Sequence, residues 1–203
     1  MASNEQLLVI KKALEQLGIT FLDIQTPIAN SIEKKVKNLM LTEGMSFEIA
    51  LKKELHGLEP FFIYSRSFYL GLFYNFPLII LKKLEGMEKK LLFNLLKIIL
   101  LAVIFFYFFK NLVYEILAVG SSAVIAVLVV SVLLFGIVAR TKTKTSYRFF
   151  INKTLLMLIF FSLLFFMTSA ILSKGIMLLF VFYYFYVILE NYQKHTLFCK
   201  TFT

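Results

Sequence analysis

The sequence predicts an all-α integral membrane protein, in which a bundle of four membrane-spanning helices follows a small N-terminal three-helix cytosolic domain. The composition is the first observation: 60% of the 203 residues are hydrophobic and 17% are charged, against roughly 45–50% and about 25% in a soluble domain. The second is that the apolar residues of the second half form continuous stretches of about 20, the length that crosses a bilayer core. A β-barrel would instead show alternating apolar residues and frequent turns, and the chain has only 8 Gly and 3 Pro.

Residues 1–60 are predicted to form the cytosolic domain, as three short amphipathic helices. The first ends at Gly18, the second begins at about Asp23 or three residues later and ends at Gly44, and the third begins at the N-cap Ser46. Apolar residues recur with helical spacing along one face of each helix, so that the three faces close a small core. These residues are Leu7, Leu8, Ile10, Leu14 and Leu17, then Ile24, Ile28, Ile32, Val36 and Met40, and finally Phe47, Ala50, Leu51, Leu55 and Leu58.

The charge of this domain argues against nucleic acid as a partner. Its seven lysines and eight acidic residues give a net charge of about −1, whereas the whole chain carries +10. The positive charge therefore belongs to the membrane part, where it reports topology and forms no basic patch on a soluble surface.

Residues 61–91 are predicted to link the domain to the membrane. The aromatic stretch 61–81 contains Arg66, Asn75 and Pro77, so we expect an interfacial elbow or a re-entrant fifth helix there rather than a span. The charged residues that follow are predicted to lie in water. A true span at 61–81 would move the first domain to the other side of the membrane and disturb the charge pattern described below.

Four spans and a short cytosolic tail complete the predicted chain. The spans lie within residues 92–190, and each is near the length that crosses a bilayer, while the tail is residues 191–203. The spans are expected at about 92–109, 112–139, 154–173 and 175–190.

Lysine and arginine residues are distributed unevenly over the loops between these spans. Nineteen of them lie on one side of the predicted membrane: twelve before residue 92, five in residues 140–153 and two after residue 190. The other side receives only Lys110 and Lys174. This positive-inside pattern predicts that both termini are cytosolic, in a bacterial cytoplasmic (inner) membrane whose lipid bilayer is one partner of the protein.

Two features of the second predicted span are candidate functional sites. Glu115 is the one acidic residue within the apolar region, and an ionisable group at membrane depth is a candidate proton or cation site. Its position near Lys110, close to the outer surface, favours an interfacial ion pair instead. Ala118, Ser122 and Ala126 form a stripe of small residues that lets two helices approach closely. The neighbouring helix belongs to the same chain or to a second copy, and we favour the same chain.

The sequence contains no pattern typical of a catalytic, cofactor-binding or metal site. His56 and His195 lie in different parts of the chain, and we expect neither to have a second ligand at metal-binding spacing. Cys199 is the only cysteine, so it has no redox partner within the chain, and its expected role is that of a thiol at the membrane edge. We therefore expect no enzymatic activity.

A family resemblance covers about a quarter of the chain. The run from Asp23 to Leu51, DIQTPIANSIEKKVKNLMLTEGMSFEIAL, resembles the HAAS signalling domain that precedes membrane spans in many bacterial proteins. The sequence departs from the family's pattern after Ala50, where residues 55–60 (LHGLEP) stand in place of a Leu-Gly-Asp or Leu-Gly-Ser turn. The resemblance implies a regulatory or signalling membrane component. The residues that carry it are Asp23, Ile28, Ile32, Glu33, Gly44, Met45, Ser46, Phe47, Glu48 and Ala50.

These observations lead to two functional hypotheses. In the first, the protein is non-enzymatic and regulatory or signalling, and residues 1–60 bind a cytosolic protein partner while the helical bundle senses or anchors. In the alternative, it is a transporter subunit or an oligomeric pore, such as a membrane-permeabilising effector, and Glu115 and the small-residue stripe support that interpretation. A bundle of four helices is too small to enclose a water path alone, so the alternative requires a homo-oligomer.

Overall fold

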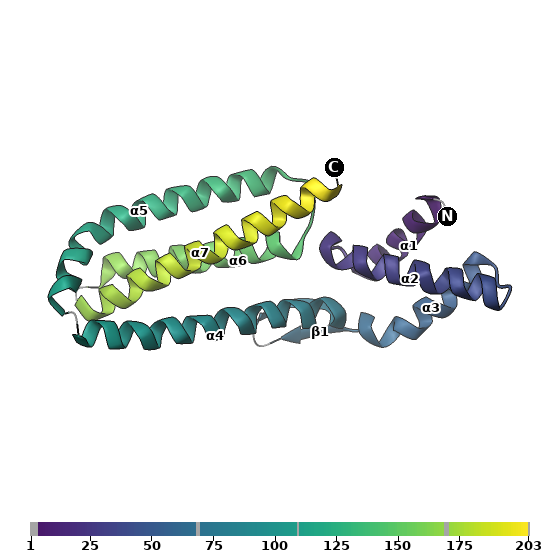
Figure 1. The fold of residues 1–203 in the computed structure, drawn as a ribbon, viewed down its shortest axis with the longest axis horizontal. Coiled ribbons are helices and arrows are strands. Elements are labelled where there is room, and N and C mark those ends of the chain that lie inside the picture. The colour runs from purple at the N-terminus through teal and green to yellow at the C-terminus, as the bar shows by residue number, and fades with distance from the viewer. Residues whose placement is uncertain (1–3, 68–69, 109, 169–170, 203) are drawn as a thin grey trace. The chain divides into compact units, whose positions relative to one another are not determined.

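The computed structural model describes residues 4–67, 70–108, 110–168 and 171–202, and these form seven helices and one two-stranded β-hairpin (Figure 1). The all-α prediction is confirmed, with the hairpin as its one exception in the described residues. The contacts divide the chain into two compact units. The N-terminal unit comprises Met1–Lys89 together with Lys144–Ser146, and the C-terminal unit comprises Lys90–Thr143 and Tyr147–Thr203.

The N-terminal unit begins with three helices at the places that the sequence predicts. They are α1 (Asn4–Gln16), α2 (Leu22–Thr42) and α3 (Phe47–Phe62). The chain turns after α1 at Gly18 and after α2 at Gly44, and both glycines have a positive φ, +87° and +64°. Glycine adopts this left-handed conformation without the steric cost that a side chain adds, which explains why the helices stop there.

Helices α1 and α3 both pack on α2, and the buried residues of the three helices form the core of this unit. The predicted apolar faces are confirmed in their centres, whereas Leu8, which was predicted to be buried, is 54% exposed. Leu8 lies on the outer side of α1 because it directly follows Leu7, and neighbouring residues on a helix point about 100° apart. The buried apolar residues of these helices are Ile10, Leu14, Ile24, Ala29, Ile32, Val36, Ala50, Leu51 and Phe62.

A β-hairpin follows α3, so the possible fifth helix at residues 61–81 is not formed in the described part of this segment, while its interfacial position stays a prediction. Strand β1 (Tyr64–Ser67) pairs antiparallel with β2 (Gly71–Pro77), and Tyr64 lies opposite Pro77. The aromatic residues of this segment favour strands, and proline is tolerated as the last residue of an edge strand because no ladder hydrogen bond is needed there. The aromatic residues are therefore compatible with strands as well as with a membrane interface.

The hairpin also moves the domain boundary from residue 60 to Lys89. A Cβ added at Gly18 would overlap the Tyr64 hydroxyl and lie 3.2 Å from Pro77, so the turn after α1 packs closely on the base of the hairpin. The Ser67 hydroxyl donates a hydrogen bond to Glu85, in the first part of α4 (Leu78–Phe108). Residues 61–89 are therefore part of the N-terminal unit rather than a linker.

The C-terminal unit contains the later part of α4 together with α5 (Lys110–Arg140), α6 (Ser146–Met167) and α7 (Ile171–Phe202). Ser146, the first residue of α6, belongs to the N-terminal unit. These helices, drawn in Figure 1, share one hydrophobic core. The buried members of the core are Leu91, Val124, Val127, Val138, Ile151, Leu155, Leu158, Phe165, Leu178, Val181, Tyr183, Tyr184, Val187 and Ile188.

Aromatic residues and one buried hydrogen bond hold α7 against its neighbours. The ring of Phe161 stacks on Phe180 at a centroid distance of 4.5 Å and on Tyr184 at 5.5 Å. The hydroxyl of Tyr183 donates a hydrogen bond of 2.7 Å to the backbone carbonyl of Leu91. A buried hydroxyl without a partner would be costly, so this bond fixes α7 against α4 at that level.

Within the described residues, three helices are long and apolar enough to cross a membrane: Val119–Arg140, Ser146–Met167 and Ser173–Thr201. They correspond to the second, third and fourth predicted spans. The chain therefore has helices that suit a lipid bilayer, as the composition predicts. The first predicted span, 92–109, is not among these three helices, and its last residue lies outside the described residues. It stays a prediction.

The helix ends differ from the predicted span ends because hydropathy marks only the part of a helix that suits lipid. Helix α6 begins at Ser146 rather than at residue 154, and α7 continues to Phe202, so residues 191–202 are helical rather than a separate tail. The ion pair between Lys194 and Glu190, one turn apart at 2.5 Å, stabilises this polar extension of α7.

Candidate functional site

The two candidate features of the second predicted span lie on α5, and the structure describes them only in part. The side chains of Glu115 and Ala118 lie outside the described residues. Ser122 and Ala126 are exposed, so these two do not make the contact with another helix of the same chain that we favoured. Among the described side chains of α5, the buried ones are Gly120, Val124, Val127, Ser131 and Val138.

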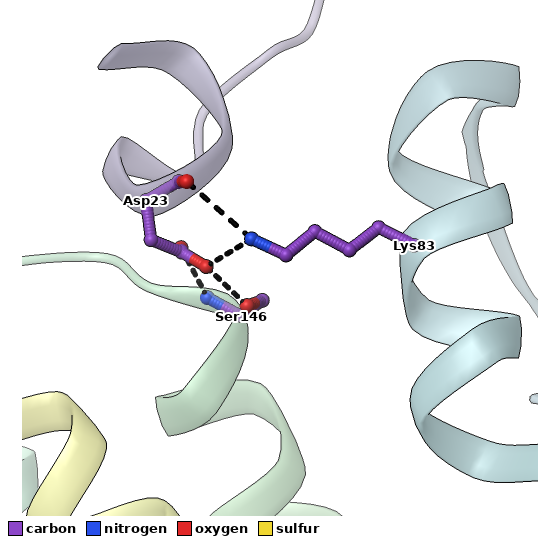
Figure 2. A network of polar contacts seen from close by, with 3 residues as sticks. All are labelled: Asp23, Lys83 and Ser146. Carbon is purple, nitrogen blue, oxygen red and sulfur yellow. Dashed lines mark hydrogen bonds and ion pairs between the residues drawn. The ribbon is translucent and has the colours of Figure 1, made fainter. Parts of the chain in front are cut away.

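The most developed polar site lies in the N-terminal unit and is centred on Asp23 (Figure 2). The backbone N–H of Ser146 donates to one Asp23 carboxylate oxygen at 2.7 Å, and the Ser146 hydroxyl donates to the other. The ammonium group of Lys83 lies 2.8 Å from that second oxygen. We call these three residues the Asp23 cluster. They come from the first turn of α2, the first part of α4 and the first residue of α6.

Two backbone features explain why Asp23 makes these contacts. The N–H of Leu22 donates to the Lys144 carbonyl at 2.9 Å, which fixes the first turn of α2 against the segment Lys144–Ser146. Pro27 has no N–H, so it cannot donate to the carbonyl of Asp23 four residues earlier as a helix requires. The Lys83 ammonium lies 3.4 Å from that carbonyl and takes the place of the missing donor. Lys83 therefore binds both the main chain and the side chain of Asp23.

The electrostatics of the Asp23 cluster favour a carboxylate. The Asp23 side chain is only 3% exposed, so its charge must be compensated by nearby groups. Lys83 supplies the opposite charge, and the N–H of Ser146 is one of the helix-terminal donors that favour anions. Because the Lys83 side chain is 36% exposed, its ammonium also keeps contact with water, which lowers the desolvation cost of the pair.

A second buried polar residue, Gln25, ties α1 to the same end of α2. Its amide nitrogen donates to the Lys11 carbonyl at 3.1 Å and to the Ile19 carbonyl at 3.3 Å. Asp23 and Gln25 are the two polar residues among the otherwise apolar buried residues that are described in α2. Together they fix the start of α2 to α1, to α4 and to the segment Lys144–Ser146.

The geometry of the Asp23 cluster suits mechanical linkage better than catalysis. A serine beside a carboxylate and a lysine has the residue types of a nucleophilic site. Ser146 is fully buried, however, and its hydroxyl already donates to Asp23. No substrate could reach that oxygen without opening the contacts among α2, α4 and Lys144–Ser146.

A smaller polar group lies in the C-terminal unit, where α7 continues past the predicted span. His195 is fully buried, and its Nε2 atom lies 3.0 Å from the Thr141 hydroxyl. The Cys199 sulfur lies 3.7 Å from the same nitrogen and 3.0 Å from the Thr143 hydroxyl. The expectation that His195 has no neighbouring ligand type is therefore wrong, because the helix places Cys199 one turn after it. No third histidine, cysteine or acidic side chain joins them in the described part of the chain.

The sequence contains a weak signal for the Asp23 cluster, and the prediction did not use it. The position of Asp23 predicts a residue at the start of a helix, where an acidic side chain is common and usually exposed, and the family resemblance supplies no site for it. Pro27 in the second turn of the same helix is the additional signal, because it leaves the Asp23 carbonyl in need of an outside donor. Nothing local identifies Lys83 or Ser146 as partners, since they follow Asp23 by 60 and 123 residues.

Comparison of the chain with protein-family models, with curated proteins and with solved structures gave no match.

Proposed function

We propose that the protein is a non-enzymatic membrane protein of the regulatory or signalling class, whose N-terminal helices bind a cytosolic protein partner. The observation that carries this proposal is the buried Asp23 carboxylate, which holds together α2, the start of α4 and the first residue of α6. A change in the position of α2 must therefore alter the contacts of Lys83 and Ser146. The chain enters the C-terminal unit at Lys90, seven residues after Lys83, and at Tyr147, directly after Ser146.

The proposal includes a membrane topology. Three helices suit a bilayer, and the apolar later part of α4, which shares their core, is proposed as the fourth span of the bundle. The positive-inside pattern supports a bacterial cytoplasmic membrane with both termini in the cytosol. In that topology the N-terminal unit lies entirely in the cytosol, since the segment Lys144–Ser146 belongs to a cytosolic loop.

The test compares the gene deletion with single variants of the full chain in the native host. With expression adjusted so that equal amounts of each variant are present in the membrane fraction, we expect Asp23→Ala to reproduce the change in the transcript profile that the deletion causes. Glu33→Ala is the matched control, because Glu33 also lies on α2 but, among the residues that the structure describes, pairs only with Lys37 one turn away, at 2.7 Å. A profile that follows the wild type in Asp23→Ala would contradict the proposal.

A dye-entry experiment in the same host tests the alternative of a transporter subunit or an oligomeric pore. The exposed positions of Ser122 and Ala126 leave the small-residue stripe open to a second copy. Under that hypothesis, overproduction of the wild type increases the entry of a membrane-impermeant dye, and Ser122→Leu with Ala126→Leu abolishes the increase. We expect no increase in dye entry with either protein.

A further inference from the structure

An apolar groove lies between α1 and α3 in the N-terminal unit, with a volume of about 770 Å³. Helices α1 and α3 both pack on α2, and residues of both helices line the groove. Val9 and Ala13, one turn apart, line it from α1, and Leu51, Leu55 and Phe62 line it from α3. Two rows of apolar side chains at helical spacing therefore face a common space.

The exposure of the groove indicates the size of its occupant. Val9 is 45% exposed and Ile49, also in the lining, is 60% exposed. Small-molecule sites bury about 70–90% of their ligand's surface, and an open trough of this kind would leave such a ligand largely in water. An amphipathic helix is the usual occupant of an open apolar groove, because it covers the groove with its apolar face and keeps its polar face in water.

The charges at the groove edge add a second requirement. Glu48 and Lys52 lie one turn apart on α3, and neither forms an ion pair with another residue in the described part of the chain. The neighbouring polar residues of the lining already have partners: Lys53 pairs with Glu43 at 2.9 Å, and Nδ1 of His56 lies 2.9 Å from a carboxylate oxygen of Glu59. A bound helix with a basic and an acidic residue one turn apart would complement both open charges.

The overall charge argues against an anionic membrane as the occupant. Residues 1–60 carry seven lysines and eight acidic residues, whereas segments that bind anionic lipid carry clusters of basic residues. A protein helix satisfies both the apolar rows and the mixed charges of the groove edge, and a lipid surface satisfies only the first.

We propose that this groove binds one amphipathic helix of a cytosolic protein. The helix places its apolar side chains between α1 and α3, with a basic residue opposite Glu48 and an acidic residue opposite Lys52. This inference rests on the proposed regulatory function and names the kind of partner and the surface that receives it. The bound partner helix would pack as a fourth helix beside α1 and α3.

The first experiment locates the occupant by photo-crosslinking in native membranes. A photoreactive phenylalanine analogue replaces Ile49 in the full chain, and the control carries it at Leu41. Leu41 is a matched position because it is aliphatic, lies on α2 of the same unit and is 86% exposed, but is not part of the groove lining. We expect position 49 alone to crosslink to a segment of another protein with apolar residues at helical spacing, as mapped by mass spectrometry of the crosslinked peptide.

Four outcomes of this experiment would overturn the inference: a crosslink to a second copy of this chain, a crosslink to lipid, equal yields at positions 49 and 41, or no product at either position. A failure of this kind leaves the proposed function testable, because the comparison of Asp23→Ala with Glu33→Ala does not depend on the groove.

The second experiment measures the binding of a synthetic peptide with the crosslinked sequence to the full chain in lipid nanodiscs. We expect Ile49→Glu to weaken binding by about tenfold or more, since it places a charge among apolar contacts, and Leu41→Glu to leave it within about twofold. Lys52→Glu should weaken binding to the original peptide, and reversing the facing acidic residue of the peptide should restore it. Equal affinities for Ile49→Glu and the wild type would refute the groove as the binding surface.

Discussion

The backbone N–H of Ser146, the first N–H of α6, donates a 2.7 Å hydrogen bond to the carboxylate of Asp23, which precedes it by 123 residues. Free N–H groups at a helix start are usually satisfied by a side chain from the residue just before the helix. Here a residue of the N-terminal helices supplies the acceptor. Formation of the first turn of α6 is therefore linked to the position of α2.

Removal of the Asp23 carboxylate should destabilise the protein strongly. In Asp23→Ala, the N–H and hydroxyl of Ser146 lose their buried acceptor and Lys83 loses its counter-ion. We expect the free energy of unfolding to fall by about 3 kcal/mol. This is the lower end of the range for breaking a buried ion pair, because the Lys83 ammonium can be solvated by water. Asp23→Asn should lose less, since its amide oxygen still accepts from Ser146. Denaturant titrations in mixed micelles, followed by circular dichroism, measure both values, and equal losses would contradict the role of the charge.

Pro27→Ala should have the opposite effect on α2. Alanine restores the N–H that can donate to the Asp23 carbonyl, and proline in a helix interior costs up to about 3 kcal/mol relative to alanine. Part of this gain is offset, because the unfolded chain gains freedom when proline is removed. We expect a net increase of about 1 kcal/mol in unfolding free energy, together with weaker coupling between Asp23→Ala and Lys83→Met. A decrease in stability would show that Pro27 is needed for a contact other than the one with Lys83.

Gly18 and Gly44 form a matched pair for testing the contact between α1 and the hairpin. Both have a positive φ, but a Cβ at Gly18 would overlap the Tyr64 hydroxyl, whereas a Cβ at Gly44 has no neighbour within 4 Å. Gly44→Ala should cost about 1 kcal/mol for the backbone conformation alone. Gly18→Ala should cost more, and adding Tyr64→Phe should recover part of the difference. Melting temperatures of the four proteins provide the measurement, and equal shifts for the two alanine variants would contradict the packing described for the hairpin.

Tyr183→Phe should weaken the C-terminal unit with little change in shape. The variant removes the buried hydrogen bond to the Leu91 carbonyl, which is worth about 1 kcal/mol, and leaves that carbonyl without its donor. Tyr186→Phe is the control, because Tyr186 is 60% exposed and its hydroxyl can be replaced at little cost. Unfolding free energies in mixed micelles should separate the two variants, and indistinguishable values would show that the Tyr183 bond is dispensable.

The sequence predicted features that depend on local pattern and missed features that depend on distant partners. The three N-terminal helices followed from apolar spacing and from glycines at Gly18 and Gly44, and three spans followed from hydropathy. The hairpin was missed because its aromatic residues favour both strands and membrane interfaces, and composition alone cannot separate the two.

The candidate site shows the same division. The sequence places Asp23 at a helix start and in the family resemblance, but no local feature connects it with Lys83 or Ser146. The groove residues Leu51 and Leu55 were predicted to be core, and both do line an apolar surface. Their proposed use as a docking surface depends on the groove between α1 and α3. Apolar periodicity does not predict such a groove.

Hydrogen exchange of the full chain in lipid nanodiscs tests the central claim, that Asp23 links the N-terminal helices to the start of α6. The measurement compares the wild type with Asp23→Ala and with Glu33→Ala, and follows peptides that cover residues 144–150 and the first turns of α4. Asp23→Ala should increase exchange in both segments, because the Ser146 N–H and Lys83 lose their shared partner. Glu33→Ala should leave both segments unchanged. Unchanged exchange at residues 144–150 in Asp23→Ala would contradict the account.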